Sequence, residues 1–175
     1  MGEAMGEAMS RPFDLLLGRK TYEIFAAHWP YATDQPAADV LNSATKYVAS
    51  TTLDAVEWQN SILLEGDVAE AVSRLKEEEG PEIQVHGSGN LIQTLLEHDL
   101  VDEYRLWTFP VVLGTGKRLF ADGAIPSGLK LVDSKTSTTG VVIATYERGG
   151  EVEYASFALE QPTEAEVQRR QRLDG

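Results

Sequence analysis

The sequence predicts one α/β domain built on a mixed, mostly parallel sheet with flanking helices and an antiparallel C-terminal hairpin. From residue 13 to residue 98, short apolar runs alternate with amphipathic helical patterns, the order typical of parallel strands joined by crossover helices. Beyond residue 98, long segments of alternating polarity indicate a hairpin. The length of 175 residues suits a single domain, which we expect over residues 1–160, followed by an exposed C-terminal helix over residues 161–175.

Composition excludes several classes of function. The net charge of −13 argues against a nucleic-acid partner, because contacts to a phosphate backbone need basic patches. No apolar run is long enough for a membrane span, and the N-terminus lacks the features of a secretory signal. The absence of cysteine rules out disulfides, thiolate metal sites and cysteine nucleophiles, and it is compatible with a cytoplasmic location. No ligand spacing predicts a metal site.

The first expected elements are a helix, a buried strand and a second helix. Methionines recur every four residues at Met1, Met5 and Met9, which predicts a short helix with one apolar stripe. Residues 13–18 contain three consecutive leucines before a glycine, the pattern of a strand that is buried on both faces. A helix over residues 19–29 follows, and a Trp-Pro pair ends it.

The middle of the chain continues the alternation of strands and helices. A short helix is expected over residues 36–44, and a longer amphipathic one over residues 67–79, with Asp67 as its N-cap. A Gly-Pro pair ends the longer helix, and a glycine-rich turn over residues 87–90 precedes a further helix over residues 91–98. The intervening strands are expected at residues 46–50, 61–64 and 83–86.

The last part of the chain is expected to be antiparallel. A hairpin turns at Thr139-Gly140, and a final edge strand could follow it. Thr163 and Glu166 have the spacing of a capping box, which indicates a helix in the tail. The antiparallel strands are expected at residues 104–112, 129–137, 141–147 and 153–157.

Three loops follow predicted parallel strands, at the sheet edge where α/β proteins bind their ligands. The first carries Gly18, Arg19, Lys20 and Thr21. The glycine allows a ligand to approach the backbone, the two cations attract anions, and the start of the helix offers free N–H groups. An ordinary helix start with surface cations would have the same residues.

The other two loops are rich in hydroxyl groups and glycine. Ser50 and Thr51 could hold a phosphate or a ribose, although such residues are also common in turns. Two glycines let the third loop present N–H groups to a pyrophosphate, although the full dinucleotide fingerprint is absent. This loop consists of Gly87, Ser88, Gly89 and Asn90. Three such loops at equivalent strand ends predict a site for a phosphorylated dinucleotide.

Acid–base candidates are few. His28 and His98 end predicted helices and are interpreted as caps or surface groups. His86 precedes the glycine turn, where a core histidine is favoured over one that orients the turn. No serine–histidine–acid set or nucleophile elbow is present, so no catalytic residue is assigned. A bound cofactor would then supply the chemistry, and hydride transfer needs least from side chains.

Three motifs occur together in one order along the chain. They are Leu17-Gly18-Arg19-Lys20-Thr21-Tyr22, Gly87-Ser88-Gly89-Asn90 and Leu113-Gly114-Thr115-Gly116-Lys117-Arg118-Leu119-Phe120. Together they resemble the dihydrofolate reductase-like family, in particular the branch that contains the reductase domain of the bifunctional riboflavin-biosynthesis deaminase-reductase. The likeness runs from about Phe13 to Glu147. It implies a mixed sheet with flanking helices, NADPH as hydride donor, and often a homodimer.

The resemblance also implies roles for individual residues. Arg19, Lys20 and Thr21 would lie at the cofactor phosphates, as would the turn from Gly87 to Asn90. Ser50 and Thr51 would lie near the adenosine 2′-phosphate. The border of the nicotinamide or substrate pocket would be formed by Leu113 and Gly114.

The sequence departs from the family pattern in two ways. Family members begin with a central strand and a loop that often ends Ser-Leu-Asp-Gly, whereas this sequence starts at the helix before the Gly18 motif. We expect that the sequence lacks its true beginning, because the loss of a central strand would leave two sheet edges open. The helix that carries the substrate-binding acid in folate reductases offers only Glu3 and Glu7, neither of which matches a motif, so folate is not supported as substrate.

The leading hypothesis is an NADPH-dependent reductase of a small heterocycle, resembling the 5-amino-6-(5-phosphoribosylamino)uracil reductase domain of riboflavin biosynthesis. The alternative is a non-catalytic module that binds a nucleotide or a flavin on the same fold. A purely structural dimer is a third possibility. Oligomeric state rests on the family resemblance alone.

Overall fold

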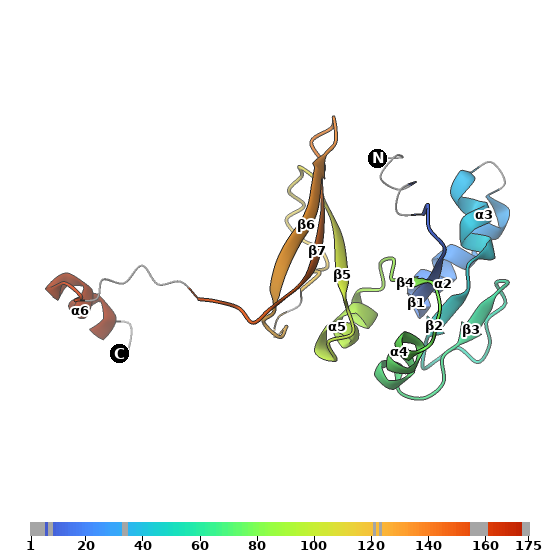
Figure 1. Ribbon diagram of the computed structural model, residues 1–175, viewed down its shortest axis with the longest axis horizontal. Helices are drawn as coiled ribbons and strands as arrows, with labels where there is room; N and C mark the ends of the chain where they lie inside the picture. The colour runs from blue at the N-terminus through green and yellow to red at the C-terminus, as the bar shows by residue number, and fades with distance from the viewer. Residues whose placement is uncertain are drawn as a thin grey trace.

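The computed structural model describes residues 6, 9–32, 35–120, 122, 124–154 and 161–172 (Figure 1). It confirms the α/β fold, with parallel strands first and an antiparallel hairpin after them. Most of the helix expected from the methionine repeat lies outside the described residues, and so does the end of the strand expected at residues 153–157. The described beginning of that segment, Glu153 and Tyr154, is not a strand.

Four parallel strands form the first sheet, with β1 at its centre. The strands are β1 Phe13–Gly18, β2 Lys46–Ala49, β3 Ser61–Leu63 and β4 Glu82–Gln84, in the order β3-β2-β1-β4. Leu15, Leu16 and Leu17 of β1 are each at most 1% exposed. The leucine run is therefore a strand buried on both faces, as its sequence predicts.

Helices pack on both faces of this sheet. On one face are α2 Arg19–Ala26 and α3 Pro36–Ser43, and on the other are α4 Val68–Glu77 and α5 Gly89–Glu97. The predicted N-cap of α4 is confirmed, since the Asp67 carboxylate accepts a hydrogen bond from the Glu70 amide at 3.0 Å. The helix expected over residues 19–29 is shorter, because α2 ends at Ala26 and a separate 3₁₀ turn, η1 Trp29–Tyr31, carries the proline.

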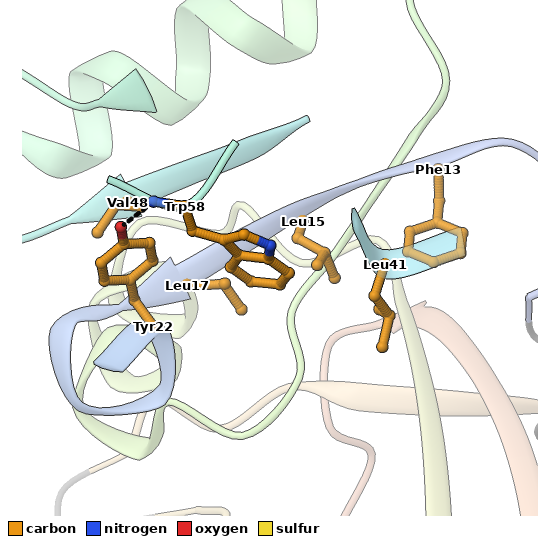
Figure 2. Packing of buried hydrophobic residues seen from close by; sticks show 7 residues of the cluster. All are labelled: Phe13, Leu15, Leu17, Tyr22, Leu41, Val48 and Trp58. Carbon is orange, nitrogen blue, oxygen red and sulfur yellow. Dashed lines mark hydrogen bonds between the residues drawn. The ribbon is translucent and has the colours of Figure 1, made fainter. Parts of the chain in front are cut away.

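Two apolar clusters hold these layers together. Leu16 of β1 packs with Val72 of α4 and with Leu91 and Leu95 of α5. The larger cluster lies on the opposite face (Figure 2) and consists of Phe13, Leu15, Leu17, Tyr22, Leu41, Val48 and Trp58. Burial of each large apolar side chain contributes about 1.5–3 kcal/mol.

A fully buried lysine, Lys46, begins β2. Its ammonium group donates hydrogen bonds to the carbonyls of Leu41 at 3.1 Å and Asn42 at 2.9 Å, near the end of α3. The same nitrogen lies 4.2 Å from the centroid of the Trp58 ring. A cation at this position satisfies carbonyls that have no partner inside the helix and interacts favourably with the helix dipole.

The antiparallel strands are β5 Glu103–Thr108, β6 Gly128–Thr136 and β7 Val142–Gly150, in the order β5-β7-β6. The hairpin between β6 and β7 turns at Gly140, whose φ of 82° favours glycine. The strand expected over residues 104–112 ends at Thr108. Pro110, two residues later, has no N–H to donate to a ladder.

Within the described residues, the two sheets share no hydrogen-bonded ladder. An ion pair joins them instead: Nη1 and Nη2 of Arg105 on β5 donate to the two carboxylate oxygens of Glu82 on β4, at 2.9 and 2.7 Å. The tail helix, α6 Glu164–Gln171, has the predicted cap, because the Thr163 hydroxyl accepts from the Glu166 amide at 3.3 Å. No helix among the described residues is long and apolar enough to cross a membrane.

Candidate functional site

The carboxyl ends of β1, β2 and β4 meet at one edge of the parallel sheet, so the loops that follow them are neighbours. Gly18 at the end of β1 is in register with Ala49 at the end of β2. On the other side of β1, Leu15 is in register with Gln84, the last residue of β4. All three loops predicted from the sequence therefore start at this edge.

Ser88 joins the first loop to the third. The Gly18 amide donates a hydrogen bond to Ser88 Oγ at 2.9 Å, and Ser88 Oγ donates to Thr21 Oγ1 at 2.9 Å. Ser88 adopts a left-handed conformation with φ of 61°, which few non-glycine residues do. A Cβ built on Gly87 would lie 3.5 Å from Thr21 Oγ1, so the two turns approach each other closely.

Two helices begin at this junction with open N-termini. Neither Gly18 before α2 nor Ser88 before α5 makes a side-chain cap hydrogen bond, and neither first turn carries an acidic residue. The free N–H groups and the positive ends of the helix dipoles attract anions. A Cβ built on Gly89 would meet no atom within 4 Å, so the start of α5 faces open space. Asn90, the next residue, is exposed.

Arg19 links the first loop to the second, through a residue that the sequence prediction missed. Its Nη1 donates to Thr52 Oγ1 at 2.9 Å, and its Nε lies 3.7 Å from Glu23 Oε1. The Ser50 hydroxyl accepts hydrogen bonds from two amides of its own loop, those of Thr52 at 3.1 Å and Leu53 at 3.0 Å. The hydroxyl of Ser50 thus shapes the loop, and Thr52 contacts the cation.

Thr51 and Lys20, which the sequence also predicted for the site, are both exposed. Thr52 could have been included from the sequence, since the hydroxyl run continues through it. Its contact with Arg19 could not, because the contact spans 33 residues.

A hydrogen bond from α5 ties the segment between β5 and β6 to this edge. Gln93 on α5 donates its side-chain amide to the Leu119 carbonyl at 2.8 Å. Leu113 is 79% exposed, and Gly114 has a φ of 74°. The place of Leu113 and Gly114 at a substrate pocket stays a prediction.

His86 stands directly before the glycine turn. Its Nε2 lies 2.8 Å from Gln84 Oε1, and its ring stacks on Phe13 with centroids 6.3 Å apart and an interplanar angle of 17°. Burial, together with the positive charge of Arg105, lowers the pKa of His86 below its ordinary value. The imidazole is therefore neutral at pH 7.

A hollow of about 630 Å³ lies at the other end of α2. Tyr22, Glu23 and Trp58 line it, with Tyr31 at its exposed rim. Figure 2 shows the Tyr22 hydroxyl turned toward the backbone of Trp58, from which it accepts a hydrogen bond at 3.1 Å. None of the cofactor residues predicted from the sequence lines this hollow, and its carboxylates, Glu23 and Glu57, do not suit an anion.

Comparison with known proteins places this geometry in a family. The RibD C-terminal domain matches residues 2–143. Protein YyaP of Bacillus subtilis, an uncharacterized protein, is 35% identical over 140 residues, covering 78% of this chain and 74% of its own length. Protein YwjB of the same organism, also uncharacterized, is 27% identical over 124 residues, which cover 69% of this chain and 66% of YwjB.

Solved structures agree with the sequence matches. A candidate riboflavin biosynthesis protein from Shewanella sp. PV-4 superposes with a TM-score of 0.65 at 26% identity, covering 80% of this chain and 76% of its own. A pyrimidine reductase-like protein from Corynebacterium diphtheriae superposes with a TM-score of 0.51 at 13% identity, covering 77% and 75%, and supports the fold alone. With the motifs at Gly18 and Gly87 lying at one sheet edge, the chain belongs to the reductase-like RibD C-terminal domain family.

Proposed function

We propose that this protein is an NADPH-dependent reductase that delivers hydride to a small heterocyclic substrate. The observation that carries the proposal is the junction at Ser88, where two uncapped helix N-termini open at the same strand ends. Membership of a reductase-like family supports it independently. NADPH would supply the hydride when bound, and the chain's own residues would bind and orient it.

The residues at the sheet edge suit a phosphorylated dinucleotide. The N–H groups at the starts of α2 and α5 would bind the pyrophosphate, and the open space at Gly89 would let it approach the backbone. Arg19 would carry the adenosine 2′-phosphate together with Ser50, Thr51 and Thr52. Charge-assisted hydrogen bonds contribute about 1.5–3 kcal/mol each, so several together would give micromolar affinity. The proposed cofactor set is Gly18, Arg19, Lys20, Thr21, Ser50, Thr51, Gly87, Ser88, Gly89 and Asn90, together with Thr52, which contacts Arg19.

The substrate side of the proposal is less specific. Leu113 and Gly114 would border the nicotinamide and substrate, and the substrate would be a pyrimidine, pterin or flavin-like ring. We further propose a homodimer in the cytoplasm. Apolar side chains that a partner copy would cover are exposed between β5 and β6, where Val111 is 63% and Val112 98% exposed.

A non-catalytic nucleotide-binding or flavin-binding module is the second candidate. It is favoured by the lack of a good proton donor among the described residues of the site. His86 is the imidazole there, but its Nε2 is engaged with Gln84 and its pKa is lowered. Under this alternative NADPH or a flavin would bind, but no heterocycle would oxidise NADPH.

Titration of the purified protein with NADPH, NADH and FMN tests both candidates. We expect micromolar NADPH binding by calorimetry, weaker NADH binding, and loss of absorbance at 340 nm when a substrate heterocycle is added. Absence of NADPH binding would contradict the proposal. Tight binding without turnover across pyrimidine, pterin and flavin substrates would favour the non-catalytic module.

A further inference from the structure

Polar side chains occupy alternate positions along and just beyond β4. Glu82, Gln84 and His86 are two residues apart, and side chains at this spacing point to one face of a strand. The register of β1 with β4 pairs Phe13 with Glu82, so the polar row shares the face that carries Phe13. The row ends at His86, one residue before the glycine turn.

The charge state of Glu82 decides which atoms donate and which accept in the hydrogen bonds along this row. Burial alone would raise the pKa of Glu82, but hydrogen bonds from Arg105 and Gln84 outweigh it and hold this pKa below its ordinary value. The carboxylate is thus ionised at neutral pH and can only accept hydrogen bonds. It accepts two from Arg105, at 2.9 and 2.7 Å.

The side-chain amide of Gln84 connects Glu82 to His86 by hydrogen bonds. Gln84 Nε2 donates to Glu82 Oε1 at 2.6 Å, which turns Gln84 Oε1 toward His86 Nε2 at 2.8 Å. A carbonyl oxygen only accepts, so His86 Nε2 must carry a proton. In the neutral imidazole, the other nitrogen, Nδ1, then presents a lone pair.

Nδ1 of His86 has no hydrogen-bond partner within the described part of the chain, although the ring is partly buried and stacked on Phe13. The residues that follow, Gly87 and Ser88, form the junction with Gly18. Nδ1 is accessible to solvent, so a donor from a ligand can reach it and form the hydrogen bond that the described residues do not supply.

We propose that His86 recognises the substrate, with Nδ1 accepting a hydrogen bond from a ring N–H of the heterocycle. The inference rests on the proposed function, because it adds the substrate class to that site. Rings with an unsubstituted lactam or ureide N–H fit this acceptor, and rings whose nitrogens are all alkylated do not.

A matched pair of probes tests the proposal: 6-aminouracil, and 6-amino-1,3-dimethyluracil, which keeps the amino group and lacks the ring N–H. Calorimetry with and without saturating NADPH should show binding of 6-aminouracil about tenfold tighter than its dimethyl analogue. His86→Leu should remove this preference. His86→Asn, whose side-chain oxygen can replace Nδ1 as acceptor, should keep part of it. His98→Leu, at an exposed histidine at the end of α5, is the matched control.

Nitrogen-15 correlation spectra of the histidine rings give a second readout that does not depend on binding. The wild type should show the Nε2–H tautomer of His86 at pH 7, and Gln84→Leu should yield a mixture of tautomers together with a smaller preference for 6-aminouracil. An Nδ1–H tautomer in the wild type would overturn the inference, and so would an equal loss of affinity for both probes in His86→Leu.

Failure of the inference is distinguishable from failure of the proposed function. If NADPH binds while wild type and His86→Leu treat the two probes alike, the role of His86 is wrong and the reductase proposal stands. If NADPH does not bind but the probe preference depends on His86, the role of His86 stands and the reductase proposal fails.

Discussion

The backbone amide of Gly18 donates its hydrogen bond to the side chain of Ser88, 70 residues further along the chain. Through this contact, the end of β1 and the start of α5 form one corner rather than two separate loops. Because the Ser88 hydroxyl also donates to Thr21, a single oxygen sets the relative position of two helix N-termini. We therefore expect the junction to respond as a unit to substitution.

Removing the Ser88 hydroxyl should weaken both the fold and NADPH binding. Ser88→Ala leaves the Gly18 amide without its partner, which costs about 1–3 kcal/mol of unfolding free energy. Ser88→Gly loses the same hydroxyl but relieves the left-handed conformation, so it should be less destabilised. Both variants should bind NADPH about tenfold more weakly. Denaturant unfolding measures the loss of stability, and calorimetry measures the loss of NADPH affinity. Ser73→Ala, at an exposed position on α4, should change neither quantity.

Substitution of two glycines with open surroundings distinguishes an effect on ligand binding from an effect on fold stability. A Cβ at Gly89 or at Gly80 meets no atom within 4 Å, and neither residue has a positive φ. Gly89→Ala should therefore leave the unfolding free energy within about 0.5 kcal/mol of the wild type. It should still weaken NADPH binding about tenfold, because the methyl group occupies space at the start of α5. Gly80→Ala, in the turn before β4, should bind NADPH like the wild type. Equal NADPH affinity in both variants would exclude a pyrophosphate at Gly89.

Arg19 should decide between NADPH and NADH. Its guanidinium contacts Thr52, in the loop that is proposed to hold the 2′-phosphate. Arg19→Gln should reduce NADPH affinity about tenfold and leave NADH affinity within about twofold. Arg74→Gln, on the exposed surface of α4, is the charge-matched control. If NADH affinity fell as much as NADPH affinity, Arg19 would be bound to another part of the cofactor.

Local signals were sufficient to predict most elements of the fold. The β1 strand and the Asp67 cap of α4 were both predicted, because an unbroken run of leucines and a capping side chain are visible in neighbouring residues of the sequence. The strand β5 ends earlier than predicted because Pro110 cannot donate to a ladder, and the prediction of this strand used periodicity alone.

The contacts that build the candidate site could not be predicted in the same way. The role of Thr52 and the bonds of Ser88 to Gly18 and Thr21 join segments that meet only after the sheet has formed. Lys46 is a further case, because a lysine at the start of a strand is usually exposed, and only the end of α3 explains its burial.

Lys46 should make stability depend on alkaline pH. Burial lowers the pKa of Lys46 from 10.5 to about 8 in the folded protein. Between these two values the unfolded chain binds more protons than the folded one, so the unfolding free energy should rise with pH in this window. The rise is at most about 3 kcal/mol, since each pKa unit corresponds to about 1.4 kcal/mol.

The variant Lys46→Met isolates this contribution. It removes both hydrogen bonds to the α3 carbonyls, and should be less stable than the wild type at every pH, by about 1–3 kcal/mol at pH 7. The gap between the two proteins should widen from about pH 8 to pH 10.5, because only the wild type gains stability from this group. Lys130→Met, on the exposed part of β6, is the control substitution over the same range. A gap that narrows as the pH rises would mean that the two carbonyls and the Trp58 ring stabilise the charged amine more than burial destabilises it.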